Sequence, residues 1–142
     1  MDKTLIIILI ILIIVIVGAW LIYKNPQPAT SYDIQGMKIE TLEEGTGEGA
    51  KVGDNIEVNY TGTLLDGTKF DSSLNPGRTP FQYTLGQNMV IQGWELGILG
   101  MKVGEKRRLT IPPELAYGPA GRPPVILPNA TLIFEIDLLD IK

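Results

Sequence analysis

The sequence predicts an α+β domain, an antiparallel β-sheet wrapped over one short α-helix, with a single transmembrane helix in front of it. Three observations predict this fold. An uncharged apolar run occupies residues 5–23, and the pattern from Ile34 onward has mostly the two-residue period that is typical of strands. One stretch, residues 90–101, instead places its apolar side chains at helical spacings of three and four.

The apolar run LIIILIILIIVIVGAWLIY, nineteen residues from Leu5 to Tyr23, is long enough to cross a bilayer. At about 1.5 Å per residue it covers nearly the ~30 Å of the hydrocarbon core. A cleaved signal peptide and a buried core helix are the alternatives. The apolar part of a signal peptide is usually shorter, whereas Trp20 and Tyr23 stand where aromatic side chains anchor a spanning helix. We therefore expect residues 1–24 to form an uncleaved, single-pass membrane anchor.

The charges around this run favour one orientation. Lys3 and the terminal ammonium group precede the run, and Lys24 follows it. The slight excess in front favours a cytoplasmic N-terminus and a main domain on the extracytoplasmic side. Residues 25–33 contain two prolines and small polar side chains, which is typical of a short extended linker. The folded domain is expected to span residues 34–142.

Composition excludes several classes of function. The residues after Lys24 carry ten basic and fifteen acidic side chains. This negative balance repels phosphate backbones, so we expect no nucleic-acid partner. The chain has no cysteine and no histidine, which excludes disulfides, thiolate metal sites, histidine-dependent catalytic triads and most zinc sites. We expect neither a metal nor a cofactor.

The strands follow from alternation and turn chemistry. Residues 56–64 alternate apolar and polar side chains, and the Asp66-Gly67 pair, one residue further on, favours a hairpin turn. Residues 132–139 alternate in the same way. Two shorter strands are predicted, at residues 81–85 and at residues 107–111.

One helix and one long loop complete the domain. The stretch VIQGWELGILGM, residues 90–101, predicts a short helix despite its glycines. The segment YGPAGRPPVILP, residues 117–128, contains too much proline and glycine for a strand or a helix. In a domain of this size a loop of that length is usually functional.

Four sequence blocks carry a resemblance to a known family: VNYTGTLLDGTKFDSS, PFQYTLG, VIQGWELGILGMKVGEKRRLTIPPELAYG and ATLIFEIDLL. From about Met37 to Ile141, the order and spacing of these blocks resemble the FKBP-type peptidyl-prolyl cis-trans isomerases in their minimal single-domain form. The resemblance implies a curved antiparallel sheet around a short helix, with an apolar pocket between the two.

The resemblance also implies which residues form the pocket. Trp94 would form its floor, Phe70 and Asp71 would lie on one side, and Tyr117 would close the other. The expected catalytic residues are Asp71, Tyr117 and Phe70. The expected substrate-binding residues are Tyr60, Phe81, Val90, Ile91, Trp94, Val125, Ile126 and Phe134.

The implied activity is isomerisation of X-Pro bonds during protein folding, which requires no nucleophile. The barrier of about 18–20 kcal/mol comes from amide resonance, and a dry aromatic pocket favours the twisted amide. Asp71 would tune the site electrostatically, and the Tyr117 hydroxyl would donate to a substrate carbonyl. The implied partners are proline-containing polypeptides, with macrolide inhibitors as further ligands. The alternative is a non-catalytic chaperone or proline-peptide binding module.

Two arginines mark departures from the family pattern. Arg122 stands where relatives commonly have histidine, and Pro123-Pro124 directly after it stiffen the loop. This departure bears on the preference for the residue before proline. Arg78 is the candidate for the arginine that the family places near Asp71.

Overall fold

The computed structural model of the chain describes residues 2–24 and 30–142, except for the side chains of residues 21–24. Residues 25–29 of the expected linker and the side chain of Tyr23 therefore lie outside the described part. Helix α1, Lys3–Lys24, contains a segment long and apolar enough to cross a membrane, with none of it buried. A signal sequence would share these properties, so α1 is an apolar helix suited to either role.

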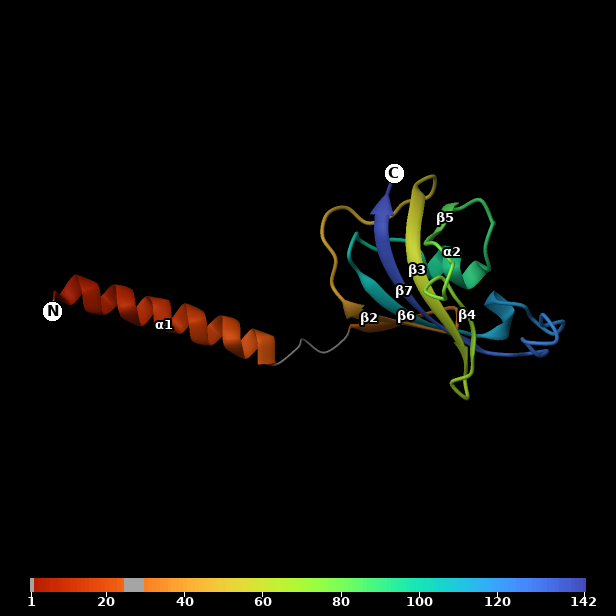
Figure 1. The fold of residues 1–142 in the computed structure, drawn as a ribbon, viewed down its shortest axis with the longest axis horizontal. Coiled ribbons are helices and arrows are strands. Elements are labelled where there is room, and N and C mark those ends of the chain that lie inside the picture. The colour runs from red at the N-terminus through yellow and green to blue at the C-terminus, as the bar shows by residue number, and fades with distance from the viewer. Residues whose placement is uncertain (1, 25–29) are drawn as a thin grey trace.

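Seven strands form one antiparallel sheet that curves around helix α2 (Figure 1). The neighbouring strands follow the order β1-β2-β6-β7-β3-β4, and β5 also pairs with β3. Their bounds are β1 Ser31–Ile34, β2 Met37–Glu43, β3 Asn55–Leu64, β4 Lys69–Ser72, β5 Phe81–Thr84, β6 Lys106–Ile111 and β7 Leu132–Ile141. The α+β class and the antiparallel sheet around one short helix are confirmed.

Strand β3 pairs with three other strands, and two of them, β4 and β5, share one of its edges. It pairs with β7 along its length, with β5 through residues 55–58 and with β4 through residues 61–63. Tyr60 lies on β3 between the part that pairs with β5 and the part that pairs with β4. The turn between β3 and β4 contains Gly67 at φ 86°, a conformation that favours glycine, so the predicted hairpin is confirmed.

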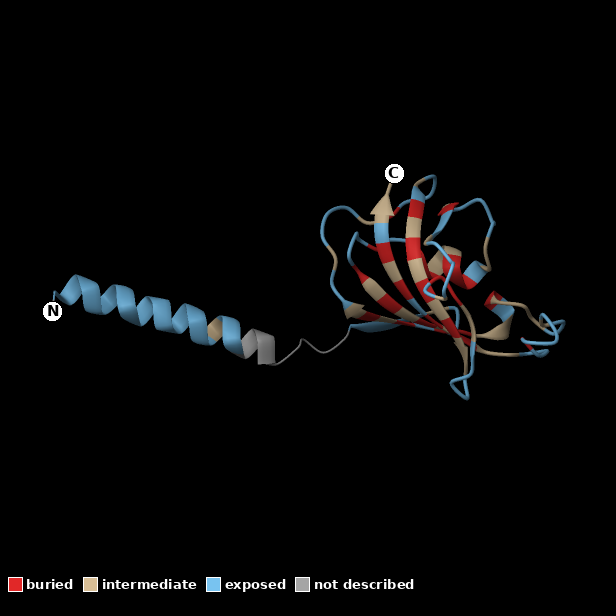
Figure 2. Ribbon diagram, in the orientation of Figure 1, coloured by how far each residue is buried: buried red, intermediate tan, exposed pale blue. Residues whose placement is uncertain are grey.

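The core lies between the concave face of the sheet and α2. Buried side chains alternate with more exposed ones along β3, β6 and β7, which Figure 2 shows as bands on these strands. Burial of one face is the reason for the strict period of two in the sequence. The predicted strands at residues 56–64, 81–85, 107–111 and 132–139 are confirmed, within two residues at either end.

Strands β1, β2 and β4 were not among the strands predicted individually. Strand β1 pairs with β2 through Ser31 to Ile34, so the sheet begins inside residues 25–33, the segment expected to be a linker. The pairing supplies backbone hydrogen bonds that a local pattern does not reveal. Residues 31–33 therefore belong to the folded domain.

Helix α2 is shorter than predicted, spanning Gln92–Ile98 rather than residues 90–101. Ile91 is extended, at φ −60° and ψ 150°. Gly100 has φ +78°, which no helical residue adopts. The apolar spacing extends into the flanking segments because these also contribute side chains to the core, among them Met101.

Two glycines set the distance between α2 and strand β6. A Cβ atom at Gly93 would lie 2.5 Å from Cγ2 of Ile111, and one at Gly97 would lie 2.5 Å from Cδ1 of Leu109. Glycine costs about 1 kcal/mol relative to alanine inside a helix. Close packing of the helix backbone on β6 explains why the helix contains both.

Replacing Gly93 with alanine is expected to lower the free energy of unfolding by about 1–3 kcal/mol, because overpacking outweighs the gain in helix propensity. Gly97→Ala is expected to cost less, since the atom it meets is the movable end of Leu109. Urea unfolding of the full chain in detergent micelles, followed by tryptophan fluorescence, measures both. A Gly93→Ala variant as stable as the wild type would show that the helix does not depend on this contact.

Arg107 on β6 holds the end of α2. Its side chain is buried and forms an ion pair with the carboxylate of Glu105, which is buried as well. The Arg107 Nη1 atom also donates to the carbonyl oxygens of Gly97 and Leu99, at 3.0 and 3.2 Å. The second carboxylate oxygen of Glu105 accepts from the backbone N–H of Lys102 at 2.9 Å. The pair thereby links the last turn of α2 to the sheet.

Candidate functional site

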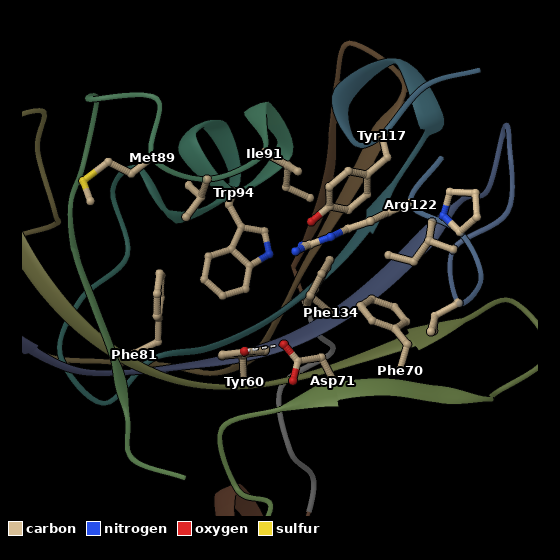
Figure 3. A pocket seen from close by; sticks show the side chains of 14 residues that line it. Tyr60, Phe70, Asp71, Phe81, Met89, Ile91, Trp94, Tyr117, Arg122 and Phe134 are labelled. Atoms are coloured by element: carbon tan, nitrogen blue, oxygen red, sulfur yellow. Dashed lines mark hydrogen bonds between the residues drawn. The ribbon is translucent and has the colours of Figure 1, made fainter. Parts of the chain in front are cut away.

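A cavity of about 470 Å³ lies at one end of the curved sheet, beside α2. All eleven residues expected at the site line this cavity, and Figure 3 shows ten of its fourteen lining side chains with labels. The cavity brings together elements that are far apart in the sequence. Its lining consists of Tyr60, Phe70, Asp71, Phe81, Met89, Val90, Ile91, Trp94, Tyr117, Arg122, Pro123, Val125, Ile126 and Phe134.

Trp94 lies at the base of the pocket, and the other rings stand around it. The first turn of α2 places it there, and its side chain is buried. Its ring is 5.1 Å from that of Tyr60 and 5.3 Å from that of Phe134, both nearly perpendicular to it. Phe81 closes a third side at 6.0 Å. Edge-to-face contacts of this kind fix ring orientation, so the base and walls form a defined apolar surface.

Gly62 makes room for two of these rings. A Cβ atom at this position on β3 would lie 2.6 Å from Cζ of Phe70 and 2.8 Å from Cε1 of Phe134. The two rings meet over the glycine at 5.5 Å, edge to face. A larger residue at position 62 would push the two rings apart and open the wall of the pocket.

Asp71 is the centre of a polar network at the edge of the apolar surface. The Tyr60 hydroxyl donates to Asp71 Oδ2 at 2.6 Å, and the backbone N–H of Ser72 donates to Oδ1 at 2.9 Å. Arg78 donates to the Tyr60 hydroxyl at 3.2 Å and lies 3.5 Å from Asp71 Oδ1. The structure therefore places Arg78 beside Asp71, as the sequence comparison suggested. The carboxylate is held in one orientation without being isolated from solvent, since 41% of its side chain is exposed.

The environment keeps the Tyr60 hydroxyl protonated. Burial, followed by the hydrogen bond to Asp71, raises the pKa of Tyr60 to about 12. Both effects penalise the phenolate, because it would be desolvated and would face a carboxylate. The group therefore remains a donor to Asp71 at every physiological pH.

This raised pKa predicts a specific loss of stability in alkali. A tyrosine in the unfolded chain ionises near pH 10, so the contribution of Tyr60 is fully present below that pH and declines as the pH rises to about 12. Between pH 8 and 11 the wild type should lose about 1 kcal/mol more than Tyr60→Phe. Urea unfolding at the two pH values measures the difference. Parallel losses in the two proteins would contradict the assignment.

Tyr117 and its loop close the opposite side of the pocket. The loop folds back on itself through two backbone hydrogen bonds between Arg122 and Ile126, at 2.7 and 3.1 Å. The Arg122 guanidinium lies 5.9 Å from the centre of the Tyr117 ring. The Tyr117 hydroxyl points into the pocket in Figure 3, and no residue within the described part hydrogen-bonds to it. It is available as a donor to a ligand.

Three lining residues were not among the expected site residues: Met89, Arg122 and Pro123. The sequence marks Arg122 only as a departure from the family pattern, not as a site residue. Met89 directly precedes the predicted pair Val90-Ile91, and Pro123 follows Arg122. Adjacency to expected site residues was the available signal for both, but a local pattern does not say which neighbours face the pocket.

Comparisons with known proteins point to one family. A sequence profile of the FKBP-type peptidyl-prolyl cis-trans isomerases matches residues 46–139. The FK506-binding protein of Neisseria meningitidis serogroup B is 55% identical over 106 residues, covering 75% of this chain and 96% of that protein. FK506-binding protein 1 of Candida glabrata is 52% identical over 108 residues, 75% of this chain and 94% of that protein.

Longer proteins share the same domain. FK506-binding protein 4 of Dictyostelium discoideum is 52% identical over 104 residues, and the match covers 73% of this chain but 28% of that protein. Among solved structures, FkpA from Escherichia coli superposes with a TM-score of 0.71 at 42% identity, over 84% of this chain and 54% of that one.

Proposed function

Because this chain belongs to the family of FKBP-type peptidyl-prolyl cis-trans isomerases and is an isomerase of that type, we propose that its pocket accelerates rotation about X-Pro bonds in folding polypeptides. The pocket does so by binding the twisted amide more tightly than either planar form. Uncatalysed rotation takes tens to hundreds of seconds, slow enough to limit folding.

The observation that carries the proposal is an aromatic pocket with polar groups at its edge, Asp71 on one side and the Tyr117 hydroxyl on the other. Proline fits against the rings of Trp94, Phe81 and Phe134, and the pocket removes water from the amide carbonyl. Hydrogen bonds from water stabilise the planar, charge-separated form of the amide. Their loss costs the twisted form less, because its carbonyl is less polar. The barrier falls without any bond being made or broken.

The polar groups at the edge orient the substrate. Asp71 supplies a fixed negative charge, held by Tyr60 and Arg78, which shapes the electrostatic surroundings of the rotating amide and neither gives nor takes a proton. Tyr117 donates a hydrogen bond to a substrate backbone carbonyl. Phe70 stands beside Asp71 and completes the apolar wall.

Tyr117→Phe tests the second of these roles. We expect kcat/KM for a Leu-Pro peptide to fall about three- to tenfold, because one hydrogen bond to the substrate is worth about 0.5–1.5 kcal/mol. Tyr32→Phe is the matched control, since Tyr32 is an exposed tyrosine on β1, outside the pocket. Equal activity of the two variants would remove Tyr117 from the mechanism. Exchange of the peptide measured by NMR avoids a coupling protease.

A second candidate function, holding of unfolded segments without turnover, is favoured by the rim of the pocket. Met89 in the pocket lining is 62% exposed, and Val125 in the lining is exposed as well. Leu127, two residues after Val125 in the same loop, is also 62% exposed. Exposed apolar side chains of this kind bind apolar segments. The candidate predicts suppression of aggregation that persists when a macrolide has stopped isomerisation. Protection that ends together with isomerisation would leave catalysis as the function of the pocket.

We also propose that α1 remains attached as a membrane anchor and that the domain lies on the extracytoplasmic side. The length of the apolar helix supports the first part, and the positive charge before it supports the second. The intact mass of the membrane-extracted protein tests retention, because signal cleavage would remove most of residues 1–24. Protease added to spheroplasts, which lack the outer barriers of the cell, should digest the domain; protection until the spheroplast membrane is lysed would reverse the orientation.

A further inference from the structure

Arg122 carries a charge in the pocket lining that no carboxylate of the described residues neutralises. Asp71 and Arg122 are the two charged residues in the lining. Asp71 is matched by Arg78 and by the Tyr60 hydroxyl. Within residues 2–24 and 30–142, the Arg122 guanidinium has neither an ion pair nor a hydrogen-bond partner. The other three arginines all have carboxylate partners, namely Asp71 for Arg78, Glu105 for Arg107 and Glu135 for Arg108.

The loop places Arg122, an exposed residue, at the edge of the pocket. Two backbone hydrogen bonds with Ile126 fix the position of the residue in the loop. The guanidinium lies against the Tyr117 ring, 5.9 Å from its centre, a contact that favours a cation over an aromatic face. In Figure 3 the guanidinium extends from the loop toward the interior of the pocket. A positive charge is therefore presented to whatever occupies the cavity.

This cation stands out against the charge of the domain. The residues after Lys24 carry fifteen acidic and ten basic side chains, so the general field repels acidic ligands. A cavity of about 470 Å³ accommodates a prolyl residue and the groups directly beside it. The side chains on the residues directly beside the proline are therefore the ones best placed to reach Arg122.

We propose that Arg122 makes the pocket select clients that carry an acidic side chain on the residue directly before or directly after the proline. The substrate carboxylate pairs with the guanidinium and supplies the partner that the chain itself does not. This inference rests on the proposed isomerase activity and adds the substrate class.

The test compares pairs of peptides that differ only in charge. The full chain in detergent micelles is assayed by NMR exchange with Ala-Glu-Pro-Phe against Ala-Gln-Pro-Phe, and with Ala-Leu-Pro-Glu against Ala-Leu-Pro-Gln. We expect the wild type to favour the glutamate peptide of at least one pair about three- to fivefold in kcat/KM at low salt, since a partly exposed ion pair is modest in strength. The preference should shrink at 0.5 M NaCl.

Substitutions of Arg122 test whether this residue causes the preference for the glutamate peptide. In Arg122→Gln the glutamate-to-glutamine ratio should fall to about one, and Arg122→Lys should retain part of it. Arg108→Gln is the matched control, because this arginine pairs with Glu135 on the sheet, outside the pocket lining; it should leave the ratio unchanged. A wild-type ratio of one in both pairs, or a ratio that survives in Arg122→Gln, overturns the proposal.

A neutral reference peptide distinguishes a failure of the proposed isomerase function from a failure of the role proposed for Arg122. If the folded wild type does not accelerate exchange of Ala-Leu-Pro-Phe, the proposed isomerase function itself fails. If it accelerates that peptide and shows no charge preference, only the role of Arg122 fails. Each ratio is measured within one variant, so an effect of the substitution on total activity does not enter the comparison.

Discussion

Asp71→Asn is expected to lower kcat/KM for a Leu-Pro peptide about tenfold or more while leaving the fold intact. Asparagine keeps the shape of the side chain but removes the charge that Tyr60 and Arg78 orient. A fixed charge beside the reacting group in a water-poor site stabilises the transition state by at least about 1.4 kcal/mol, which corresponds to a tenfold change in rate. The loss should appear mainly in kcat, since the apolar walls that hold proline are unchanged.

Asp140→Asn is the matched control for this prediction. Asp140 is a partly exposed aspartate near the end of β7 that pairs with Lys142, outside the pocket lining, so its replacement should leave the rate unchanged. Circular dichroism and the urea midpoint establish that both variants are folded. Full activity of Asp71→Asn would show that the carboxylate is structural and that the aromatic surface alone accelerates the reaction.

Arg107→Met is expected to have the largest effect on stability, a loss of about 3–5 kcal/mol in the free energy of unfolding. The substitution leaves the buried carboxylate of Glu105 without its partner and removes the donors to the carbonyl oxygens of Gly97 and Leu99. A buried unpaired charge is far more costly than a lost surface contact.

Two further variants separate the causes of that loss. Arg108→Met, on the same strand, breaks a partly exposed pair with Glu135 and should cost at most about 1 kcal/mol. The double variant Arg107→Met with Glu105→Leu removes the unpaired charge and should recover part of the stability, but not the hydrogen bonds to α2. Equal losses for Arg107→Met and Arg108→Met in urea unfolding would contradict the account.

The sequence predicted those elements whose burial imposes a long, regular pattern. Strands β3 and β7 are each ten residues long with one buried face, so their alternation is visible without any knowledge of partners. Strands β1 and β4 have four residues each, a length at which a pattern is seen in some strands and missed in others, since β5 of the same length was predicted. The ends of α2 depend on the backbone at Ile91 and Gly100, while the apolar spacing continues past both.

The family resemblance predicted eleven of the fourteen lining residues and gave Arg78 as the candidate for the arginine beside Asp71, but it did not predict the hydrogen bonds among them. The network of Tyr60, Asp71 and Arg78 depends on how the segment between β4 and β5 folds back over β3, and no local pattern encodes that path. The unmatched charge of Arg122 is likewise a tertiary property, because it depends on which carboxylates lie within reach. Side-chain identity is readable from sequence, whereas the balance of charges around it is not.

The most direct test of the central claim is the rate of cis-trans exchange in a Leu-Pro peptide, measured by NMR with the full chain in detergent micelles while FK506 is titrated into the sample. Tryptophan fluorescence reports occupancy of the pocket at Trp94. If the pocket is the catalytic site, exchange is rapid without FK506 and falls to the uncatalysed rate in proportion to occupancy. Exchange that stays fast when the pocket is full, or that is never accelerated by the folded chain, would contradict it.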